Sequence, residues 1–207
     1  MANKIIFATG NQNKMREIRE IYQDLDYEIL SMKEAGIEID VEENGETFLE
    51  NATIKARAVA EEVRKKETLQ DAVVMADDSG LVIDALDGEP GIYSARYMGH
   101  DTSYHIKNQN LIKRLEGVEE EKRTARFVCA IAAVCPDGEL LSAVQTMEGR
   151  IGYDEEGENG FGYDPIFFLP EYGCSSATIS PEEKNKISHR GKALREMREK
   201  LAEKFAG

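Results

Sequence analysis

Residues 72–80 read Ala-Val-Val-Met-Ala-Asp-Asp-Ser-Gly, and this stretch decides the fold. Its five small or apolar residues predict a buried β-strand that ends at Ala76. Asp77 and Asp78 follow directly, and two carboxylates are costly to bury without partners. Neighbouring side chains of a strand point to opposite faces, so we expect only one of the pair in a given cleft while the other braces the turn. A carboxylate here can bind Mg²⁺ or orient a water molecule, and an ordinary Asx turn is the alternative.

A second apolar run, residues 5–8, also predicts a buried strand that leads into a polar segment. A helix is predicted next, over residues 13 to about 24. A glycine turn between a strand and a helix start offers free N–H groups and the positive end of the helix dipole, which together bind anions. An ordinary strand-to-helix turn is an equal alternative. The segment consists of Thr9, Gly10, Asn11, Gln12, Asn13 and Lys14.

Two further elements are predicted between these strands. Residues 27–30 read as a short strand. Thr47 and Glu50 have the spacing of a capping box, so a helix begins there and continues to about Lys66.

Four polar side chains around this helix are candidates for the same site. Asn51 and Lys55 lie about one turn apart along one edge of the apolar face. Glu43 and Glu46 precede the helix and are candidates for a second metal carboxylate, with solvated loop acids as the alternative.

The second half of the chain mixes strand and helix patterns, which indicates α/β architecture. Two long strands joined by a Pro-Asp-Gly turn predict a hairpin, and the hairpin favours a mixed sheet. The predicted elements are a helix at 103–115, strands at 124–135 and 139–148, a short helix capped by Ser180 and a last helix with Leu194, Met197, Leu201 and Phe205 on one face.

Two more runs carry chemistry. Two aromatic residues flanked by glycines offer a base a stacking face, and the aspartate after them can accept a hydrogen bond from a ribose or a base. A basic cluster falls at the break between the last two helices, where its donors are expected to meet a ligand. The first run is Phe161, Gly162, Tyr163 and Asp164, and the second is Lys184, His189 and Arg190. An aromatic surface loop and a solvated helix end are the alternatives.

Composition excludes several classes of protein. The chain has 207 residues and a net charge of −14, which argues against binding polymeric nucleic acid but not against a small polyanion held by a local basic cluster. No apolar run reaches the ~18 residues of a membrane span, and no signal peptide is visible. Cys129, Cys135 and Cys174 lack metal-ligand spacing, so reduced thiols in a cytoplasmic protein are expected.

Taken in order, these runs resemble the motifs of the inosine triphosphate pyrophosphatase family, the bacterial XTP/dITP diphosphatases. Any one run is weak, but six in the family's order along nearly the whole chain are specific. They are Thr-Gly-Asn-x-x-Lys at 9–14, Glu-x-Gly-x-Thr-Phe-x-Glu-Asn-Ala at 43–52, Ala-Asp-Asp-Ser-Gly-Leu at 76–81, Pro-Gly-Ile-Tyr-Ser-Ala-Arg-Tyr at 90–97, Gly-Phe-Gly-Tyr-Asp-Pro-Ile-Phe at 160–167 and Ser-His-Arg-Gly at 188–191.

The resemblance implies one elongated, two-lobed α/β domain over residues 1–207, with a central mixed β-sheet, flanking helices and a cleft between the lobes. It also implies a homodimer, dependence on Mg²⁺, and hydrolysis of ITP, dITP and XTP to the monophosphate and pyrophosphate, which cleans the nucleotide pool. The alternatives are a related nucleotide pyrophosphatase with another base preference, for instance modified pyrimidines, and a non-catalytic nucleotide sensor.

Carried over residue by residue, the resemblance makes Asp78 the catalytic base and, with Glu43, a metal ligand, and it leaves open whether Asp77 shares that role. Ser79 is expected to contact the substrate. Lys55 and Asn51 are expected near the phosphates. The run from Thr9 to Lys14 is expected to bind the triphosphate, and the nucleoside is expected to contact Phe161, Gly162, Tyr163, Asp164, Lys184, His189 and Arg190.

Overall fold

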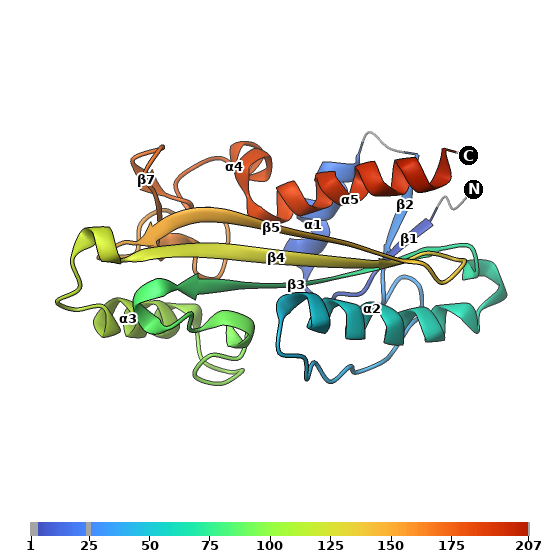
Figure 1. Ribbon diagram of the computed structural model, residues 1–207, viewed down its shortest axis with the longest axis horizontal. Helices are drawn as coiled ribbons and strands as arrows, with labels where there is room; N and C mark the ends of the chain where they lie inside the picture. Colours follow the sequence, from blue (N-terminus) through green and yellow to red (C-terminus); the bar gives the residue numbers. More distant parts are fainter. Residues whose placement is uncertain (1–3, 24–25, 207) are drawn as a thin grey trace. The chain divides into compact units, whose positions relative to one another are not determined.

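The computed structural model describes residues 4–23 and 26–206, which form an α/β fold (Figure 1). Its sheet has seven strands in the order β2-β1-β3-β4-β5-β6-β7. The strands are β1 (Lys4–Phe7), β2 (Glu28–Ser31), β3 (Val73–Ile83), β4 (Thr124–Val134), β5 (Leu140–Ile151), β6 (Phe167–Leu169) and β7 (Cys174–Ser175). The α-helices are α1 (Gln12–Tyr22), α2 (Phe48–Arg64), α3 (Tyr104–Arg114), α4 (Pro181–Ile187) and α5 (His189–Phe205).

The sheet is mixed, as the hairpin predicts. Strand β1 pairs in parallel with both β2 and β3. Strand β6 pairs antiparallel with both β5 and β7.

The described residues divide into two compact units. The first unit holds the chain up to Asp78, Cys129–Gln145 and the segment from Arg190 onward. The second unit holds Ser79–Val128 and Thr146–His189. The single two-lobed domain with a cleft stays a prediction.

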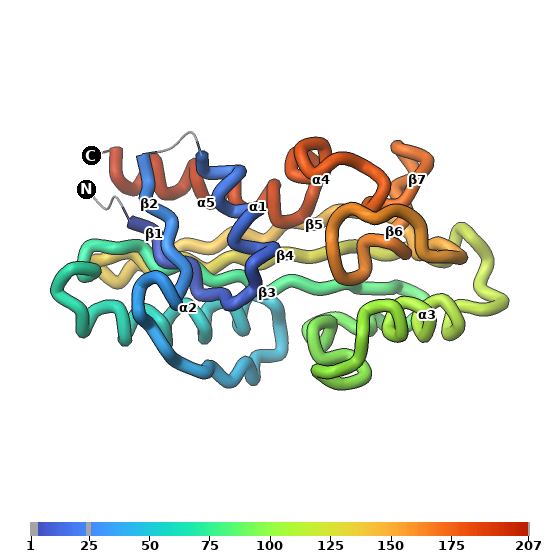
Figure 2. Tube along the Cα trace, turned by 180° about the vertical axis from the view of Figure 1, so that it is seen from behind, coloured from blue at the N-terminus to red at the C-terminus, as the bar shows by residue number. Residues whose placement is uncertain are grey.

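Alternation along the strands builds two cores in the first unit. Ile5 and Phe7 of β1 join one core, where α1 and α5 cover the sheet, and Ile6 joins the other, where α2 covers it. Figures 1 and 2 show α1 and α5 on one side of the strands and α2 on the opposite side. Strand β3 follows the same rule, with Val73 and Met75 facing α1 and α5. Because both faces are covered, residues 5–7 of β1 and 73–76 of β3 are apolar runs rather than alternating with polar residues.

The second unit has a core of its own. Leu111 and Leu115, at the end of α3, pack with Leu81 of β3, Phe127 of β4 and Phe167 of β6. Figure 2 shows α3 running along one side of these strands.

Helix starts agree with the sequence because their caps are formed. In α2, the Thr47 Oγ1 accepts from the Glu50 N–H at 3.1 Å, and the Glu50 carboxylate accepts from the Thr47 N–H at 3.1 Å. Ser103 and Ser180 cap α3 and α4, and their hydroxyl oxygens accept from the N–H groups of Ile106 and Glu183. Helix α1 begins at Gln12, one residue before the prediction, and the predicted end at residue 24 lies outside the described residues.

No helix within residues 4–23 and 26–206 combines the length and the apolar character needed to cross a membrane.

The capping box gives a test of the fold. We expect Thr47→Ala to lower the free energy of unfolding by about 1 kcal/mol, because the orphan Glu50 N–H loses its acceptor. Thr47→Ser keeps a hydroxyl and is the matched control. Urea denaturation of the variants measures both values, and equal losses in the two variants would contradict a capping role.

Candidate active site

The two adjacent aspartates lie inside β3 rather than after it, so the predicted strand end at Ala76 is wrong. The strand continues without a break to Ile83. Asp77 continues the row of Val73 and Met75, toward α1 and α5, whereas Asp78 continues the opposite row toward α2. The expectation that the two carboxylates face opposite ways is confirmed. Strand geometry persists because each carboxylate finds polar partners on its own side.

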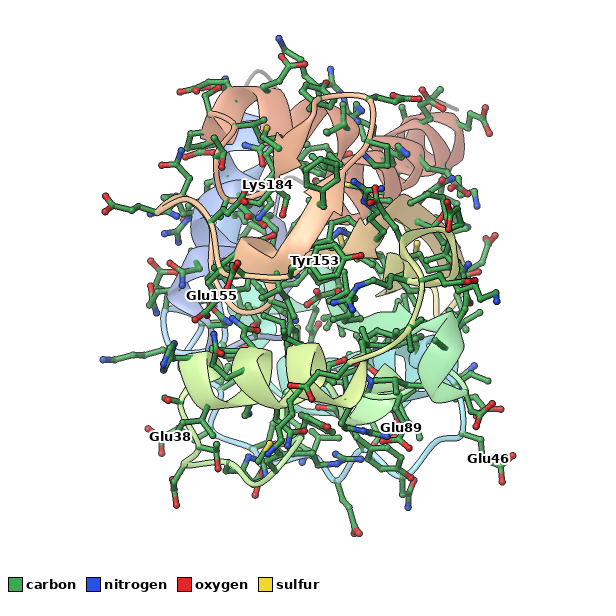
Figure 3. The ribbon with its side chains drawn as sticks, turned by 90° about the vertical axis from the view of Figure 1, so that its left-hand side faces the viewer. Glu38, Glu46, Glu89, Tyr153, Glu155 and Lys184 are labelled. Atoms are coloured by element: carbon green, nitrogen blue, oxygen red, sulfur yellow. The ribbon has the colours of Figure 1, made fainter. Side chains whose placement is uncertain are left out.

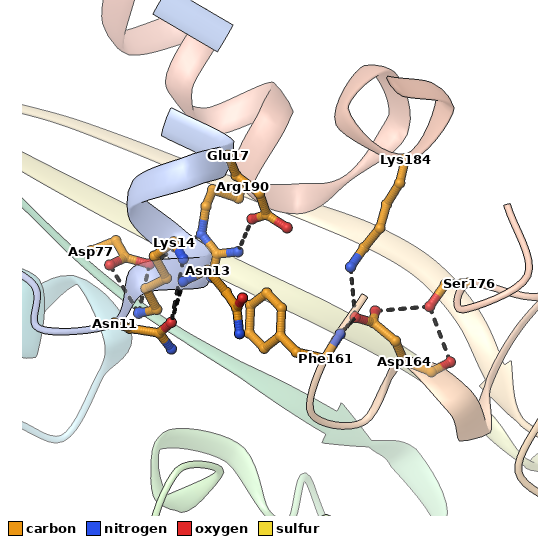
Figure 4. Close-up of polar contacts among 10 residues, drawn as sticks. All are labelled: Asn11, Asn13, Lys14, Glu17, Asp77, Phe161, Asp164, Ser176, Lys184 and Arg190. Atoms are coloured by element: carbon orange, nitrogen blue, oxygen red, sulfur yellow. Dashed lines mark hydrogen bonds and ion pairs between the residues drawn. The ribbon is translucent and has the colours of Figure 1, made fainter. Parts of the chain in front are cut away.

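Asp77 is the centre of a buried ion cluster. Its side chain is only 1% exposed. The Lys14 Nζ lies 2.9 Å from its carboxylate, and the Arg190 Nε lies 3.4 Å from it (Figure 4). The other end of Arg190 binds Glu17 at 2.5 Å. Burial alone would raise the pKa of Asp77, but the charges of Lys14, Arg190 and Lys55 outweigh it and hold the pKa well below its usual range.

Asp78 has the opposite electrostatic environment. Its carboxylate accepts one hydrogen bond from Asn51 Nδ2 at 3.1 Å. Burial and the negative charge of Glu43 raise the pKa of Asp78 to about 6, against the lowering effect of the Asn51 hydrogen bond. Adjacent residues thus carry carboxyl groups whose pKa values are pushed apart, an arrangement that separates a fixed charge from a group able to exchange protons near neutral pH.

Glu43 and Lys55 complete this side of the strand. The Lys55 Nζ lies 2.9 Å from Glu43 and donates to the Asp77 carbonyl at 3.2 Å. Glu43 therefore lies close enough to act on Asp78, whereas Glu46 is exposed and points outward (Figure 3). Two carboxylates that repel each other suit a hard divalent cation. Within the described residues no group of three or more His, Cys, Asp or Glu side chains gathers as a metal cluster, so such a cation needs further oxygen ligands from water or a phosphate.

The turn before α1 holds its own helix start. Asn11 caps α1, and its Oδ1 accepts from the N–H groups of Asn13 at 2.9 Å and Lys14 at 3.3 Å. The Thr9 hydroxyl accepts from the Asn11 N–H. Gly10, Asn11, Gln12 and Asn13 are exposed, and Lys14 reaches Asp77.

The predicted nucleoside residues of the second unit gather around Asp164. This carboxylate is 3% exposed and accepts from Lys184 Nζ at 2.6 Å, from the Phe161 N–H at 2.8 Å and from Ser176 Oγ at 2.9 Å (Figure 4). Lys184 also lies over the Phe161 ring, with its Nζ 5.4 Å from the ring centroid. Asp164 therefore fixes the positions of Lys184 and Phe161.

Glycine is required at position 160 of this loop. Its φ is +76°, and a Cβ there would lie 2.4 Å from Asp164 Oδ2 and 3.1 Å from Lys184 Nζ. The backbone must pass this close for the ion pair to form.

The two aromatic residues of the loop differ in exposure. Phe161 is half-buried, whereas Tyr163 is buried and donates its hydroxyl to the Ser94 carbonyl at 2.6 Å. Phe161 alone of the pair offers a face to a ligand.

The remaining predicted residues take structural positions nearby. Ser79 lies in β3 and is half-buried. His189 is buried, and its ring stacks on Phe127 at a centroid distance of 4.9 Å. Arg190 binds Asp77 and Glu17 within the first unit.

Sequence reasoning missed two residues of these clusters. Glu17 lies three residues after Lys14, on the same face of α1, so helical spacing offered a signal. Ser176 follows a two-residue strand and carries no such signal.

The fold and its polar groups define a class of protein: an α/β protein with buried cations beside Asp77 and Asp164. Its two carboxylates Glu43 and Asp78 suit a metal-bound anion. The sequence model of the Ham1 family matches residues 5–200, so the chain belongs to the Ham1 family. This membership confirms the resemblance read from the six motifs.

Relatives of known name match nearly the whole chain. It is 46% identical over 198 residues to a dITP/XTP pyrophosphatase of Clostridium perfringens, covering 96% of this chain and 97% of the relative. It is 43% identical over 206 residues to the dITP/XTP pyrophosphatase of Bacillus anthracis, covering 99% and 98%. Among solved structures, the Staphylococcus aureus Ham1 protein matches with a TM-score of 0.84 at 39% identity, covering 97% of this chain and 99% of that one.

The raised pKa of Asp78 predicts a gain in stability when its charge is removed. The folded state holds the Asp78 proton up to about pH 6, whereas the unfolded chain releases it near 3.8. Ionisation therefore costs stability as the pH rises between these values, and the full cost is present above pH 6. In metal-free buffer at pH 8 we expect Asp78→Asn to unfold with about 1–2 kcal/mol more free energy than the wild type, and the gain to vanish below about pH 4.

Glu46→Gln is the control for this measurement, since Glu46 is an exposed acid of the same unit. Urea denaturation across the pH range compares the three proteins. The raised pKa of Asp78 is contradicted if Asp78→Asn has no higher free energy of unfolding than the wild type at pH 8. It is also contradicted if the gain is the same at pH 4 and pH 8.

Proposed function

We propose that this protein hydrolyses dITP, XTP and ITP to the nucleoside monophosphate and pyrophosphate, with Mg²⁺ as the cofactor. The observation that carries the proposal is the raised pKa of the Asp78 carboxyl group, which is about 6. Its neighbour Asp77 is ion-paired, and the pKa of Asp77 is held far lower. The names of the dITP/XTP pyrophosphatases that match nearly the whole chain support the substrate class.

Asp78 is assigned as the general base. A carboxylate that titrates near pH 6 is ionised at neutral pH yet still basic enough to accept a proton from an attacking water. Asn51 donates to Asp78 Oδ2 and so orients the carboxylate. Attack by water is proposed at the α-phosphorus, as the family resemblance implies, and cleavage of the α–β bond releases pyrophosphate.

Glu43 and Asp78 are the residues that would hold Mg²⁺, with Lys55 beside Glu43. When bound, Mg²⁺ neutralises phosphate charge and so favours attack by water. A bound cation would remove the repulsion between the Glu43 and Asp78 carboxylates, and this relief favours its binding.

The cationic residues of the first unit are assigned to the triphosphate. Lys14 is anchored on Asp77, which places a positive charge at the start of α1 without leaving the amine to move. The turn from Thr9 to Asn13 adds polar groups, and Lys55 and Asn51 are assigned as further phosphate neighbours. Ser79 is assigned as a substrate contact.

The residues of the second unit are assigned to the base. Phe161 offers the stacking face, and Gly162, Tyr163 and Asp164 shape the loop around it. Lys184 donates to a 6-oxo group, which inosine and xanthine carry where adenine carries an amino donor. A donor left facing an amino group loses its partner, and such sites can reject the wrong base by a factor on the order of 10⁴. His189 and Arg190, the first two residues of α5, are also assigned to the nucleoside.

The proposed setting is the cytoplasm, and the proposed assembly is a homodimer. Cys129, Cys135 and Cys174 form no disulfide with one another, which fits a reducing compartment.

Substrate hydrolysis tests the proposal directly. We expect Mg²⁺-dependent release of pyrophosphate from dITP and XTP and little from dATP, because a site built for a 6-oxo purine leaves its donor unpaired against a 6-amino group. Guanine also carries a 6-oxo group, so dGTP is included to report selection at the purine 2-position. An assay that scores pyrophosphate and orthophosphate separately reports the bond cleaved. Release of orthophosphate, or equal use of dATP, contradicts the proposal.

Asp78→Asn tests the base. We expect the turnover of dITP to fall at least 10³-fold, since removing a general base costs typically 10²- to 10⁴-fold and this residue is also assigned to the metal. Its retained thermal stability separates this loss from unfolding. A folded, active variant would refute the assigned role.

Sedimentation tests the homodimer. We expect a species of twice the chain mass of 23.2 kDa at micromolar concentration. A single species at the mass of one chain excludes the dimer.

A further inference from the structure

A carboxylate outside the predicted site is clamped against α3. Glu155 precedes the aromatic loop and faces that helix (Figure 3). One carboxylate oxygen accepts from Asn108 Nδ2 at 2.7 Å, and the other accepts from His105 Nδ1 at 2.5 Å and from Gln109 Nε2 at 3.3 Å. His105, Asn108 and Gln109 have the i, i+3, i+4 spacing of one helical face. The helix therefore presents a single donor face to one acid.

Asn108 links this clamp to the aromatic loop. Its side chain is 1% exposed, and the same Nδ2 also donates to the Gly162 carbonyl at 3.3 Å. Gly162 lies between Phe161 and Tyr163. The hydrogen bond to its carbonyl therefore fixes the orientation of the peptide group between Gly162 and Tyr163.

The amide of Asn108 has only one workable orientation. Rotation by 180° would place its oxygen against the Glu155 carboxylate and the Gly162 carbonyl, two groups that only accept. In the observed orientation the Asn108 Oδ1 is buried with no partner among the residues that the structure describes. An unpaired buried oxygen is costly, and it persists here because the amide nitrogen donates to both Glu155 and Gly162.

Tyr104 supports the same loop from the first turn of α3. Its ring meets Tyr163 edge-on at a centroid distance of 5.2 Å and packs under Gly162. Helix α3 thus contacts the loop through the Tyr104 ring and the Asn108 amide, and it binds Glu155, which precedes the loop.

We propose that Asn108 and Glu155 are positioning residues that hold the Phe161 loop in the conformation that receives the purine base. They act through Gly162 and touch no reacting atom. The inference rests on the proposed function for its substrate, but the clamp itself is a property of the free protein.

The kinetic test uses Asn108→Asp, which keeps the shape of the side chain and replaces its donor with an acceptor that faces Glu155. We expect the KM for dITP to rise about tenfold with kcat within threefold of the wild type, because the base loses its platform while Asp78 is untouched. Inhibition by inorganic pyrophosphate is expected to stay unchanged, since the proposed phosphate contacts lie in the first unit. Lys113→Ala, an exposed residue of α3, is the matched control.

A second variant localises the effect to the clamp. In Asn108→Asp with Glu155→Gln, the new amide can donate to the new carboxylate, which restores one hydrogen bond in the reverse direction. We expect the KM of this double variant to return to within threefold of that of Glu155→Gln alone. No rise in KM for Asn108→Asp, no recovery in the double variant, or a parallel loss of pyrophosphate inhibition overturns the proposal.

Hydrogen exchange of the free protein separates this inference from the proposed function. The N–H groups of Glu156, Asn159, Phe161 and Asp164 are hydrogen-bonded within the second unit. We expect them to exchange at least tenfold faster in Glu155→Gln and in Asn108→Asp than in Lys113→Ala. Unchanged exchange overturns the clamp, whereas an inactive wild type with accelerated exchange in the variants overturns the proposed function and leaves the clamp standing.

Discussion

The burial of the Asp77 carboxylate is the constraint on which the first unit depends. A charge that is 1% exposed is tolerable only with cations beside it, and those cations come from α1 and from α5. Arg190 is itself buried, so its charge also needs a carboxylate partner, and Glu17 is a second such partner beside Asp77. Removing any one member takes a partner away from a buried charge. The order of β3, α1 and α5 in this unit is thereby tied to a single ion cluster as well as to apolar packing.

The chemistry of the pair follows from strand alternation. Two identical side chains in sequence are divided by the pleat, one toward the cations of α1 and α5 and one toward Asn51 and Glu43. The pleat thus leaves one carboxylate in an ion cluster that lowers its pKa and the other in surroundings that raise its pKa. No motif that names only residue types contains this information, since it resides in which face of the sheet each helix covers.

Particular residues show what sequence could and could not predict. Thr47 and Glu50 act within four residues of each other, so their capping box and the start of α2 were predictable. The end of β3 was wrongly placed at Ala76 because the partners that allow Asp77 to continue the strand come from distant parts of the chain, as with Arg190. Ser176 and Asn108 were missed for the same reason, since each becomes informative only when a folded neighbour, Asp164 or Glu155, lies opposite it. Local signals fix elements, and long-range partners fix the site.

The bare backbone at Gly160 has a consequence for protein engineering. Replacing loop glycines is a common route to stability, because it reduces the freedom of the unfolded chain. Here the missing side chain is the space in which Lys184 meets Asp164, so a methyl group would displace the ion pair that anchors the loop. Attempts to stiffen this segment must therefore leave Gly160 unchanged. The loop is held in place because Gly160 has no side chain that would displace this ion pair.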